Sequence, residues 1–259
     1  MSKENIMLTV ITEEIIEDKK KTPAPDEKIH PWRICPIGKH LVKKHNVHIP
    51  PSKEHPNGQI IERHEHCALN SSKKDILSFD EIQAITEEHF HQLTGAPKAG
   101  TLKGYTHADQ FDAEIRGWTR YWNDIFSLPD PLNANLVKAL IASESSFHSE
   151  TDISAKKHGR ARGLMQITDS TMTALSDHHG ELSDYLICFE HIKLFNPTAN
   201  ICCGVRWLFR KKITASSKLG RHANWFEAVA DYKGILKNVP HKWMEIFQHH
   251  YLCITDGCE

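Results

Sequence analysis

The chain has 259 residues, with 32 Lys and Arg against 33 Asp and Glu, which gives a formal net charge of −1. A nucleic-acid binder normally carries a strong basic excess, so this balance argues against that class of protein. Hydrophobic residues make up 39% of the chain, enough for a core. No stretch approaches about 18 consecutive apolar residues, so the sequence predicts no membrane span.

The first 28 residues are predicted to form a flexible arm. The run EDKKKTPAPDEK is charged and holds two prolines, and such a segment buries too little surface to order itself. The opening run interrupts its apolar residues with Thr and Glu and has no small-residue cleavage site, so the sequence predicts no secretory signal. We therefore expect the protein to be made in the cytoplasm without a signal peptide.

Residues 29–70 concentrate histidine. Of the 19 histidines in the chain, seven lie between His30 and His66. The segment contains several prolines and shows no helical periodicity, which predicts turns and short strands. Local enrichment in histidine is typical of metal binding.

Two half-sites in this segment have a spacing that could hold a metal ion. Cys35 and His40 form C-x4-H, and His64 and Cys67 form H-x2-C. Together they could supply the four tetrahedral ligands of one structural zinc. Two alternatives remain: a loop with hydrogen-bonded histidines, and a disulfide between Cys35 and Cys67 formed after export. The seven cysteines are an odd number with no regular framework, which favours reduced thiols with some metal ligation.

From Ser78 onward the pattern is helical. Ser78 followed by Glu81 resembles a capping box, which predicts a helix over residues 79–93. A second helix is predicted from Ala108 to Phe126, and the chain after residue 131 is predicted to be mostly helical to about His250. The fold class is therefore mainly α, with residues 71–128 as a helical region that connects the His/Cys segment to a helical domain at 129–259.

One glutamate lies on an apolar helix face. Apolar residues at helical spacing predict a core-facing stripe, formed by Leu136, Val137, Leu140, Ile141 and Phe147. Glu144 follows Leu140 by four residues and precedes Phe147 by three, so it projects from the same face. Burial there would raise the pKa of its carboxyl and suit it to act as a general acid. The alternative is a glutamate at the edge of the stripe, either solvated or paired with a lysine.

Four sequence blocks occur in order between residues 133 and 235: ESSF at 144–147, GLMQ at 163–166, NICCGVRWL at 200–208 and ADYK at 230–233. Together they resemble the soluble lytic transglycosylase and goose-type lysozyme family. The resemblance implies a lysozyme-like helical domain at 129–259. It also implies an enzyme that cleaves the bond between N-acetylmuramic acid and N-acetylglucosamine in peptidoglycan, without a cofactor for that cleavage.

The resemblance assigns roles to residues of the site. It implies that Glu144 is the catalytic acid and that the hydroxyl of Tyr232 reaches its carboxylate. Ser145 would lie in the cleft. The sugar-binding strip would comprise Gly163, Leu164, Met165 and Gln166. Within it, the glycine would let the glycan approach the backbone, the methionine would pack on a sugar face, and the glutamine would hydrogen-bond the sugar.

The chain departs from the family pattern at Lys233, where asparagine is usual. The departure puts one substrate contact in doubt, and we considered an acidic peptide stem as a partner for the lysine. The helix beginning at Asn196 is interpreted as scaffold, with Asn196 as N-cap and Pro197 at the first helical position. Its buried face would comprise Ile201, Val205, Leu208 and Phe209.

The sequence also bears on the kind of cleavage. Goose-type lysozymes carry an aspartate two residues after the Gln of GLMQ, where this chain has Thr168. The missing base favours lytic transglycosylation, in which the 6-hydroxyl of the muramic acid attacks and a 1,6-anhydro product forms. Asp169 and Asp152 remain candidates for the second carboxylate that a hydrolase needs.

The interpretation with most support is a peptidoglycan muramidase that acts in the periplasm or cell wall after export or injection. Without a signal peptide, a contractile injection system would deliver it, as a type VI secretion effector or a phage enzyme, with a secretion-apparatus or immunity protein as partner. The first alternative is a non-catalytic peptidoglycan-binding protein with a metal-dependent docking module. The second is a zinc amidase in the amino-terminal half, where Glu54, Glu62 and Glu65 are available.

Overall fold

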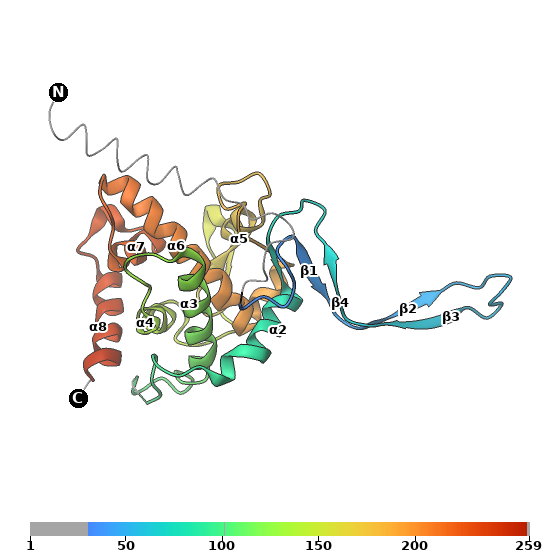
Figure 1. Ribbon diagram of the computed structural model, residues 1–259. Helices are drawn as coiled ribbons and strands as arrows, with labels where there is room; N and C mark the ends of the chain where they lie inside the picture. The colour runs from blue at the N-terminus through green and yellow to red at the C-terminus, as the bar shows by residue number, and fades with distance from the viewer. Residues whose placement is uncertain (1–30, 101, 258–259) are drawn as a thin grey trace, which may run out of the picture.

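The computed structural model describes residues 31–100 and 102–257 (Figure 1). The arm predicted at residues 1–28 lies outside these ranges. Helices dominate the described residues, as the sequence predicts. The seven α-helices among them are α2 (Phe79–His89), α3 (Asp112–Phe126), α4 (Ala134–Ser145), α5 (Asp169–Ser176), α6 (Pro197–Leu219), α7 (Trp225–Tyr232) and α8 (Lys242–Asp256).

Helix α6 is central to the packing. It contacts α2, α3 and α7, while α4 packs against α3 and α8. Trp118 and Trp122 of α3 are fully buried against α6. The Trp118 indole donates to the Thr198 hydroxyl at 2.6 Å, and the Trp122 indole donates to the Cys202 carbonyl at 3.1 Å. These contacts fix α3 on α6, and α4 packs on α3, so the end of α4 has a defined position.

The start of helix α6 agrees with the sequence. Asn196 caps α6 by accepting a hydrogen bond from the amide of Ala199, with Pro197 in the first turn. The predicted buried face of α6 is confirmed, since Ile201, Val205 and Leu208 are fully buried and Phe209 nearly so.

Helix α2 keeps only half of the predicted capping box. Ser78 accepts from the Glu81 amide at 3.3 Å. The Glu81 carboxylate instead accepts from the Arg33 guanidinium at 2.6 Å and from the Cys35 amide at 3.2 Å. The first residues of the described chain are thereby tied to α2. The α-helix ends at His89 and continues as the 3-10 helix η2 (Phe90–Gln92).

The amino-terminal part forms turns and short strands, as predicted. Strand β1 (Lys39–Val42) pairs with β4 (His66–Leu69), and β2 (His45–Ile49) pairs with β3 (Gln59–Arg63), both antiparallel. The β2–β3 hairpin extends away from the helical body in Figure 1. All five residues of β3 are exposed, so this hairpin has little contact with the helices.

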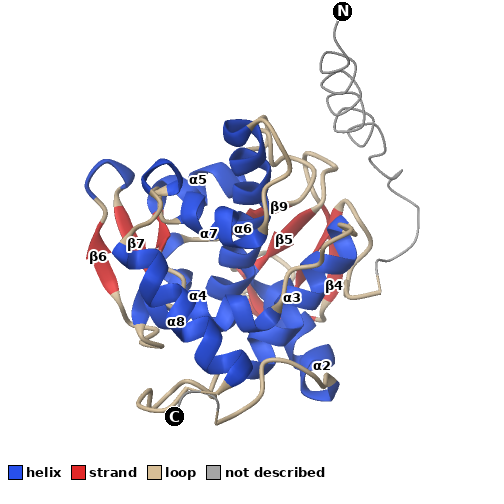
Figure 2. Ribbon diagram, turned by 90° about the vertical axis from the view of Figure 1, so that its left-hand side faces the viewer, coloured by secondary structure: helices blue, strands red, loops and turns tan. Residues whose placement is uncertain are grey.

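Two further sheets are built from short strands. Strand β5 (Ile76–Ser78) pairs in parallel with the distant β9 (Leu186–Cys188), which joins the amino-terminal part to the helical domain. The other sheet contains β6 (Asp152–Ser154), β7 (Arg160–Arg162) and β8 (Ile167–Thr168), all antiparallel. The two sheets lie on opposite sides of the helices (Figure 2).

The remaining regular elements are the 3-10 helices η3 (Lys156–His158), η4 (His191–Phe195) and η5 (Leu236–Asn238). One buried apolar cluster includes Trp32, Phe90 and Leu140, and so continues across the boundaries predicted at residues 70 and 128. Within the described ranges, no helix is both long and apolar enough to cross a bilayer.

Candidate active site

Glu144 lies in the last turn of α4, where the backbone leaves the helix by an unusual path. Ser146 and Phe147 adopt left-handed conformations with φ of 51° and 65°. A bulky residue rarely adopts such a φ, and the surrounding contacts must hold it there. Phe147 is 1% exposed and packs edge-on against Tyr105, with ring centroids 5.7 Å apart. The burial of this ring anchors the chain just beyond Glu144.

The Glu144 carboxylate is paired with Lys233. The Lys233 ammonium donates to Glu144 Oε1 at 2.6 Å, and the side chains are 7% and 18% exposed. Burial raises the pKa of the Glu144 carboxyl, while the charge and hydrogen bond of Lys233 act in the opposite direction. From the sequence, burial on the apolar face and pairing with a lysine were alternatives for this glutamate. In the structure the carboxylate is both largely buried and paired with a lysine.

Tyr232 has a different partner from the one that the resemblance implied. Its hydroxyl donates to the Met165 carbonyl at 2.6 Å, so the prediction that it reaches the Glu144 carboxylate is wrong. The ring still lies close to Glu144. Burial holds the pKa of the Tyr232 phenol well above its usual range, and the Glu144 charge raises it further. Tyr232 therefore links α7 to the GLMQ strip, and its neighbour Lys233 makes the contact with the acid.

The GLMQ strip is tied to α6 by Asn200, which is fully buried. Its Oδ1 accepts from the Met165 amide at 2.8 Å, and its Nδ2 donates to the carbonyls of Arg162 and Leu194, both at 2.8 Å. Gly163 has a φ of +74°, and a Cβ there would collide with the Asn200 side chain and the Leu194 carbonyl. The glycine is therefore needed for a protein contact, and its role in admitting a glycan stays a prediction.

Two side chains of the strip face inward. Leu164 and Met165 are fully buried. Met165 packs over Gly204 of α6, where a Cβ would collide with its sulfur. The predicted packing of Met165 on a sugar face is corrected, because its side chain has no exposed surface to offer.

Gln166 is the half-buried member of the strip. Its φ is 49°, and its Nε2 donates to the Gly163 carbonyl at 2.8 Å. It is the one side chain of the four that retains surface for a polar contact with a ligand.

Ser145 is also turned away from solvent. It is 8% exposed, and its hydroxyl donates to the Ile141 carbonyl of its own helix at 3.3 Å. Its predicted place in the cleft stays a prediction, and the next residue, Ser146, is the exposed serine at this helix end.

The two candidate second carboxylates are held by cations. Asp169 accepts from Arg162 at 2.5 Å and from the Arg160 amide at 2.7 Å, and it contacts the His191 ring at 2.9 Å. The Arg162 hydrogen bond, followed by that of the Arg160 amide, lowers the pKa of Asp169 to about 2. Asp152 accepts from the Arg160 guanidinium at 2.8 Å, and that hydrogen bond lowers its pKa too. A general base works best with a pKa near the working pH, so both carboxylates are better suited to holding the small sheet together.

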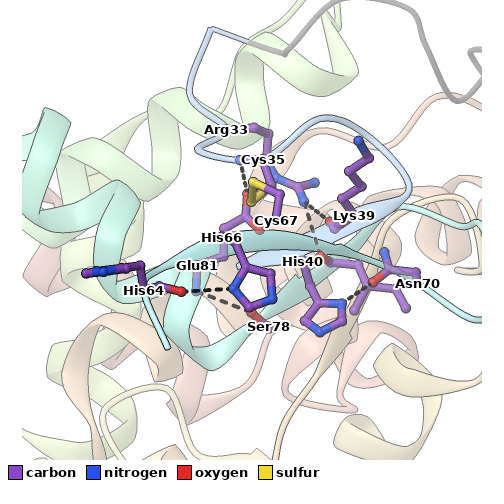
Figure 3. The surroundings of a disulfide bond; sticks show 11 residues. Arg33, Cys35, Lys39, His40, His64, His66, Cys67, Asn70, Ser78 and Glu81 are labelled. Carbon is purple, nitrogen blue, oxygen red and sulfur yellow. Dashed lines mark hydrogen bonds and ion pairs between the residues drawn. A yellow bond between two sulfur atoms is a disulfide. The ribbon is translucent and has the colours of Figure 1, made fainter. Parts of the chain in front are cut away.

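The four predicted zinc ligands do not converge. Cys35 and Cys67 form a disulfide, with Cα atoms 5.7 Å apart. Figure 3 shows the His40 ring turned to Asn70, 2.7 Å away, and the His64 side chain pointing away from the disulfide. Across residues 31–100 and 102–257, no three His, Cys, Asp or Glu side chains are placed to share a metal ion. The zinc prediction is therefore unsupported, because its two sulfur ligands are bonded to each other.

A cavity of about 620 Å³ lies beside the site, between residues 102–105 and α8. Tyr105 and His250 line it, whereas Glu144 does not. Tyr105 connects the cavity to Phe147 through the edge-on contact described above. The hollow is therefore a neighbour of the acid and does not contain it.

Residues 129–248 match the family model for the transglycosylase SLT domain. This range contains Glu144, the GLMQ strip, all of α6 and the Tyr232–Lys233 pair. Enzymes of this family are lytic transglycosylases that act on peptidoglycan, and the match indicates an enzyme activity of this kind for residues 129–248. No curated protein and no solved structure gave a match.

Sequence reasoning missed the contact between Lys233 and Glu144. The available signal was the departure from asparagine at this position of the ADYK block, which indicated a change of contact without naming the partner. The contacts of Asn200 and Gly204 with the GLMQ strip were also missed, although both residues belong to the family pattern in the NICCGVRWL block. Their importance depends on how closely α6 approaches the GLMQ strip.

Proposed function

We propose that residues 129–248 cleave the β-1,4 bond between N-acetylmuramic acid and N-acetylglucosamine by lytic transglycosylation, with Glu144 as general acid and then general base. The observation that carries the proposal is the shielded carboxyl group at the end of α4. Its pKa is raised by burial, as a proton donor at neutral pH requires. The family match supports the substrate class.

The carboxyl group of Glu144 acts twice, first as an acid and then as a base. The carboxyl group donates its proton to the glycosidic oxygen while the bond from C1 of the muramic acid to that oxygen breaks. The 6-hydroxyl of the same sugar then attacks C1, and its proton passes to the Glu144 carboxylate. The acid is regenerated, and the product carries a 1,6-anhydro ring.

Among the described residues, both candidate second carboxylates are held by arginines, which favours this route over hydrolysis. The described charge that acts on Glu144 is the cation of Lys233. Asp152 and Asp169 are paired with Arg160 and Arg162. An inverting hydrolase needs a carboxylate free to activate water.

We further propose that the protein acts outside the cytoplasm, in the periplasm or cell wall. The Cys35–Cys67 disulfide supports this, because such bonds persist in oxidising compartments. Delivery by a contractile injection system, with a secretion-apparatus or immunity protein as partner, is the corresponding route. We expect toxicity to a Gram-negative host when the chain is directed to the periplasm, and tolerance when it stays in the cytoplasm. Equal tolerance in both compartments would count against the proposal.

Glu144→Gln tests the catalytic role. The amide keeps the shape of the side chain and can still accept a hydrogen bond from Lys233, but it has no acidic proton. General acid–base catalysis contributes about 10²–10⁴-fold, so peptidoglycan cleavage should fall by at least about 10²-fold. Glu150→Gln, which changes an exposed glutamate six residues later, should retain wild-type activity. Thermal denaturation of both variants checks folding.

Mass spectrometry of the digestion products identifies the reaction. Anhydro-muropeptides from the wild type support lytic transglycosylation. Reducing muramic ends would instead indicate hydrolysis, and freed stem peptides would indicate an amidase. Wild-type protein that binds peptidoglycan without releasing products, or a Glu144→Gln variant with full activity, would overturn the proposal.

A further inference from the structure

The residue that contacts Glu144 is the one at which the chain departs from the family pattern. Lys233 is the C-cap of α7, so the end of that helix carries the ammonium group to the end of α4. The 2.6 Å contact is shielded on both sides, with 7% of the Lys233 side chain exposed. A shielded pair is screened far less by salt than a pair at the surface, so the cation acts strongly on the carboxyl group.

Few other titratable groups face this pair. Tyr232 of α7 lies close to Glu144, and its phenol remains neutral because burial raises its pKa. From α8, His250 is close enough to be affected by Lys233. Burial lowers the pKa of His250, and the charges of His249 and then Lys233 lower it further. The strongest charge acting on Glu144 is therefore the Lys233 ammonium.

Burial and the cation have opposite effects on the acid. Desolvation stabilises the protonated carboxyl, which is the form that can donate a proton. If the carboxyl becomes too weak an acid, however, proton donation becomes slow. The ammonium stabilises the carboxylate, which is the form that must later accept the proton of the 6-hydroxyl. Both forms are needed in one turnover, so the balance between the two effects determines when Glu144 can work.

We propose that Lys233 is a positioning residue that holds the Glu144 carboxyl in place and sets the pH range over which it can act as proton donor. The inference rests on the proposed function of Glu144. An asparagine at position 233 would not supply the charge. This chain should therefore lose activity at a lower pH, on the alkaline side, than a variant with a neutral residue at position 233.

The direction of the change follows from the charges. The donor form of Glu144 is protonated, so activity falls as the pH rises through the pKa of this group. Lys233 lowers that pKa, and its removal must raise it. A cation next to a carboxylate shifts the pKa by about 1–3 units, so the alkaline limb should move upward by about 1–3 pH units.

Four variants test the inference. Lys233→Met removes the charge with little change in length, and Lys233→Asn restores the residue typical of the family. Lys233→Arg keeps the charge. Lys237→Met is the matched control, because Lys237 is an exposed lysine four residues later. The measurements are the pH profile of kcat/KM on purified peptidoglycan and a carbon-13 NMR titration of the Glu144 carboxyl group in the full chain.

The expected result is an upward shift of both the alkaline limb and the NMR midpoint in Lys233→Met and Lys233→Asn. In Lys233→Arg and Lys237→Met, the alkaline limb and the NMR midpoint should stay close to their wild-type values. A merely structural lysine would lower kcat without moving the limb or the midpoint, and that outcome overturns the inference. The two neutral variants provide independent tests if one of them folds poorly.

Failure of this inference differs from failure of the proposed function. Suppose that the wild type is active, that Glu144→Gln is inactive, and that the NMR midpoint does not move in the neutral Lys233 variants. Then Glu144 is the acid, but Lys233 does not set the pH range over which it donates its proton. If the midpoint moves in a protein that cleaves no peptidoglycan, the electrostatic coupling is real and the proposed function is wrong. That second outcome overturns the inference as stated, since no proton donation then occurs.

Discussion

Asn200 shows how one buried side chain shapes the surroundings of the candidate acid. It lies on α6, yet its three hydrogen bonds are made to the backbone of Arg162, Met165 and Leu194. Arg162 is the last residue of β7, Met165 belongs to the strip, and Leu194 lies in η4 before α6. Because Tyr232 also binds the Met165 carbonyl, the amide of Asn200 and the phenol of Tyr232 hold the same residue from two directions.

Asn200→Ala should destabilise the domain. The change leaves the Met165 amide and the carbonyls of Arg162 and Leu194 without their partner in a site that has no exposure. Each unsatisfied buried group costs about 1–3 kcal/mol, so the free energy of unfolding should fall by about 3 kcal/mol or more. Urea denaturation measures this change. Asn238→Ala, at an exposed asparagine in η5, should have little effect, and an equal loss in both variants would contradict the explanation.

At this scale the sequence predicts which residues gather but not how they pair. The position of Glu144 on the apolar stripe follows from 3.6-residue periodicity, and its burial agrees with that prediction. The exchange of roles between Tyr232 and Lys233 does not follow from periodicity. These residues are adjacent at the end of α7, and the structure shows Lys233 on the acid and Tyr232 on the Met165 carbonyl.

The small sheet beside the acid is organised by the first residue of α5. Asp169 accepts from the amide and guanidinium groups of two arginines in β7, Arg160 and Arg162. Gly159 precedes that strand with a φ of +81°, and a Cβ there would collide with the Asp169 carboxylate. One side chain thus joins helix α5 to the β6–β7–β8 sheet.

Asp169 should make the stability of this region depend on pH. Its pKa is lowered from the ordinary value of 3.8 to about 2 in the folded chain. The unfolded chain therefore binds a proton more readily, and the stabilisation is present above about pH 4 and lost as the pH falls toward 2. Asp169→Asn should lower the free energy of unfolding by about 1 kcal/mol at neutral pH, a modest loss because the carboxylate is partly exposed to solvent. At low pH the variant and the wild type should become equally stable.

Thermal denaturation from pH 7 to pH 2 measures this dependence. Asp256→Asn, at an exposed residue of α8, should keep the wild-type pH profile. If the difference in Tm between Asp169→Asn and the wild type were the same at every pH, the carboxylate charge would not be the cause of the lost stability.

At the scale of elements, the long helices and the short strands of the amino-terminal part were predictable, whereas the strands β5 to β9 were not. Helix α6 was predicted from its cap, its Pro197 and its apolar stripe, and these agree with the structure. Strands β6, β7 and β8 are two or three residues long, too short for an alternating pattern to emerge. Their pairing depends on Asp169 and on tertiary contacts, which no local pattern carries.

At the scale of the whole molecule, the amino-terminal part is attached to the helical domain by several buried contacts. Trp32 packs edge-on against Phe90, and its indole donates to Asp124 at 2.8 Å. Arg33 is buried and paired with Asp75 and Glu81. Burial opposes its charge, but these carboxylates outweigh that effect and raise the pKa of the guanidinium. This segment is thus anchored by aromatic packing and ion pairs where the sequence predicted a metal ion.

The sequence could not choose between the zinc and the disulfide. Both interpretations need Cys35 and Cys67 close together, and their sequence separation of 32 does not fix the distance between them. The choice depends on the β1–β4 register, in which Cys67 lies opposite Leu41. That register pairs His40 with Ala68, and the His40 ring is hydrogen-bonded to Asn70, the residue after β4.

The disulfide should contribute strongly to the stability of the amino-terminal part. It closes a loop with a sequence separation of 32 residues, and a loop of that length restricts the unfolded chain by about 3–4 kcal/mol. Replacement of both Cys35 and Cys67 with serine should therefore lower Tm by about 10 °C, and a reducing agent should lower the Tm of the wild type similarly. The β2–β3 hairpin lies within this loop, so limited proteolysis should cut residues 43–66 faster once the bond is broken.

The control for this experiment is Cys188→Ser, which removes a free thiol and leaves the disulfide intact. That variant should still lose stability on reduction, whereas the double serine variant should lose less on the same treatment. Because the Arg33 and Trp32 contacts remain after reduction, we expect residues 129–248 to retain their fold and their activity on peptidoglycan in vitro. If reduction left both Tm and the proteolysis rate unchanged, the disulfide would not be what stabilises this segment, and its support for an oxidising compartment would weaken with it.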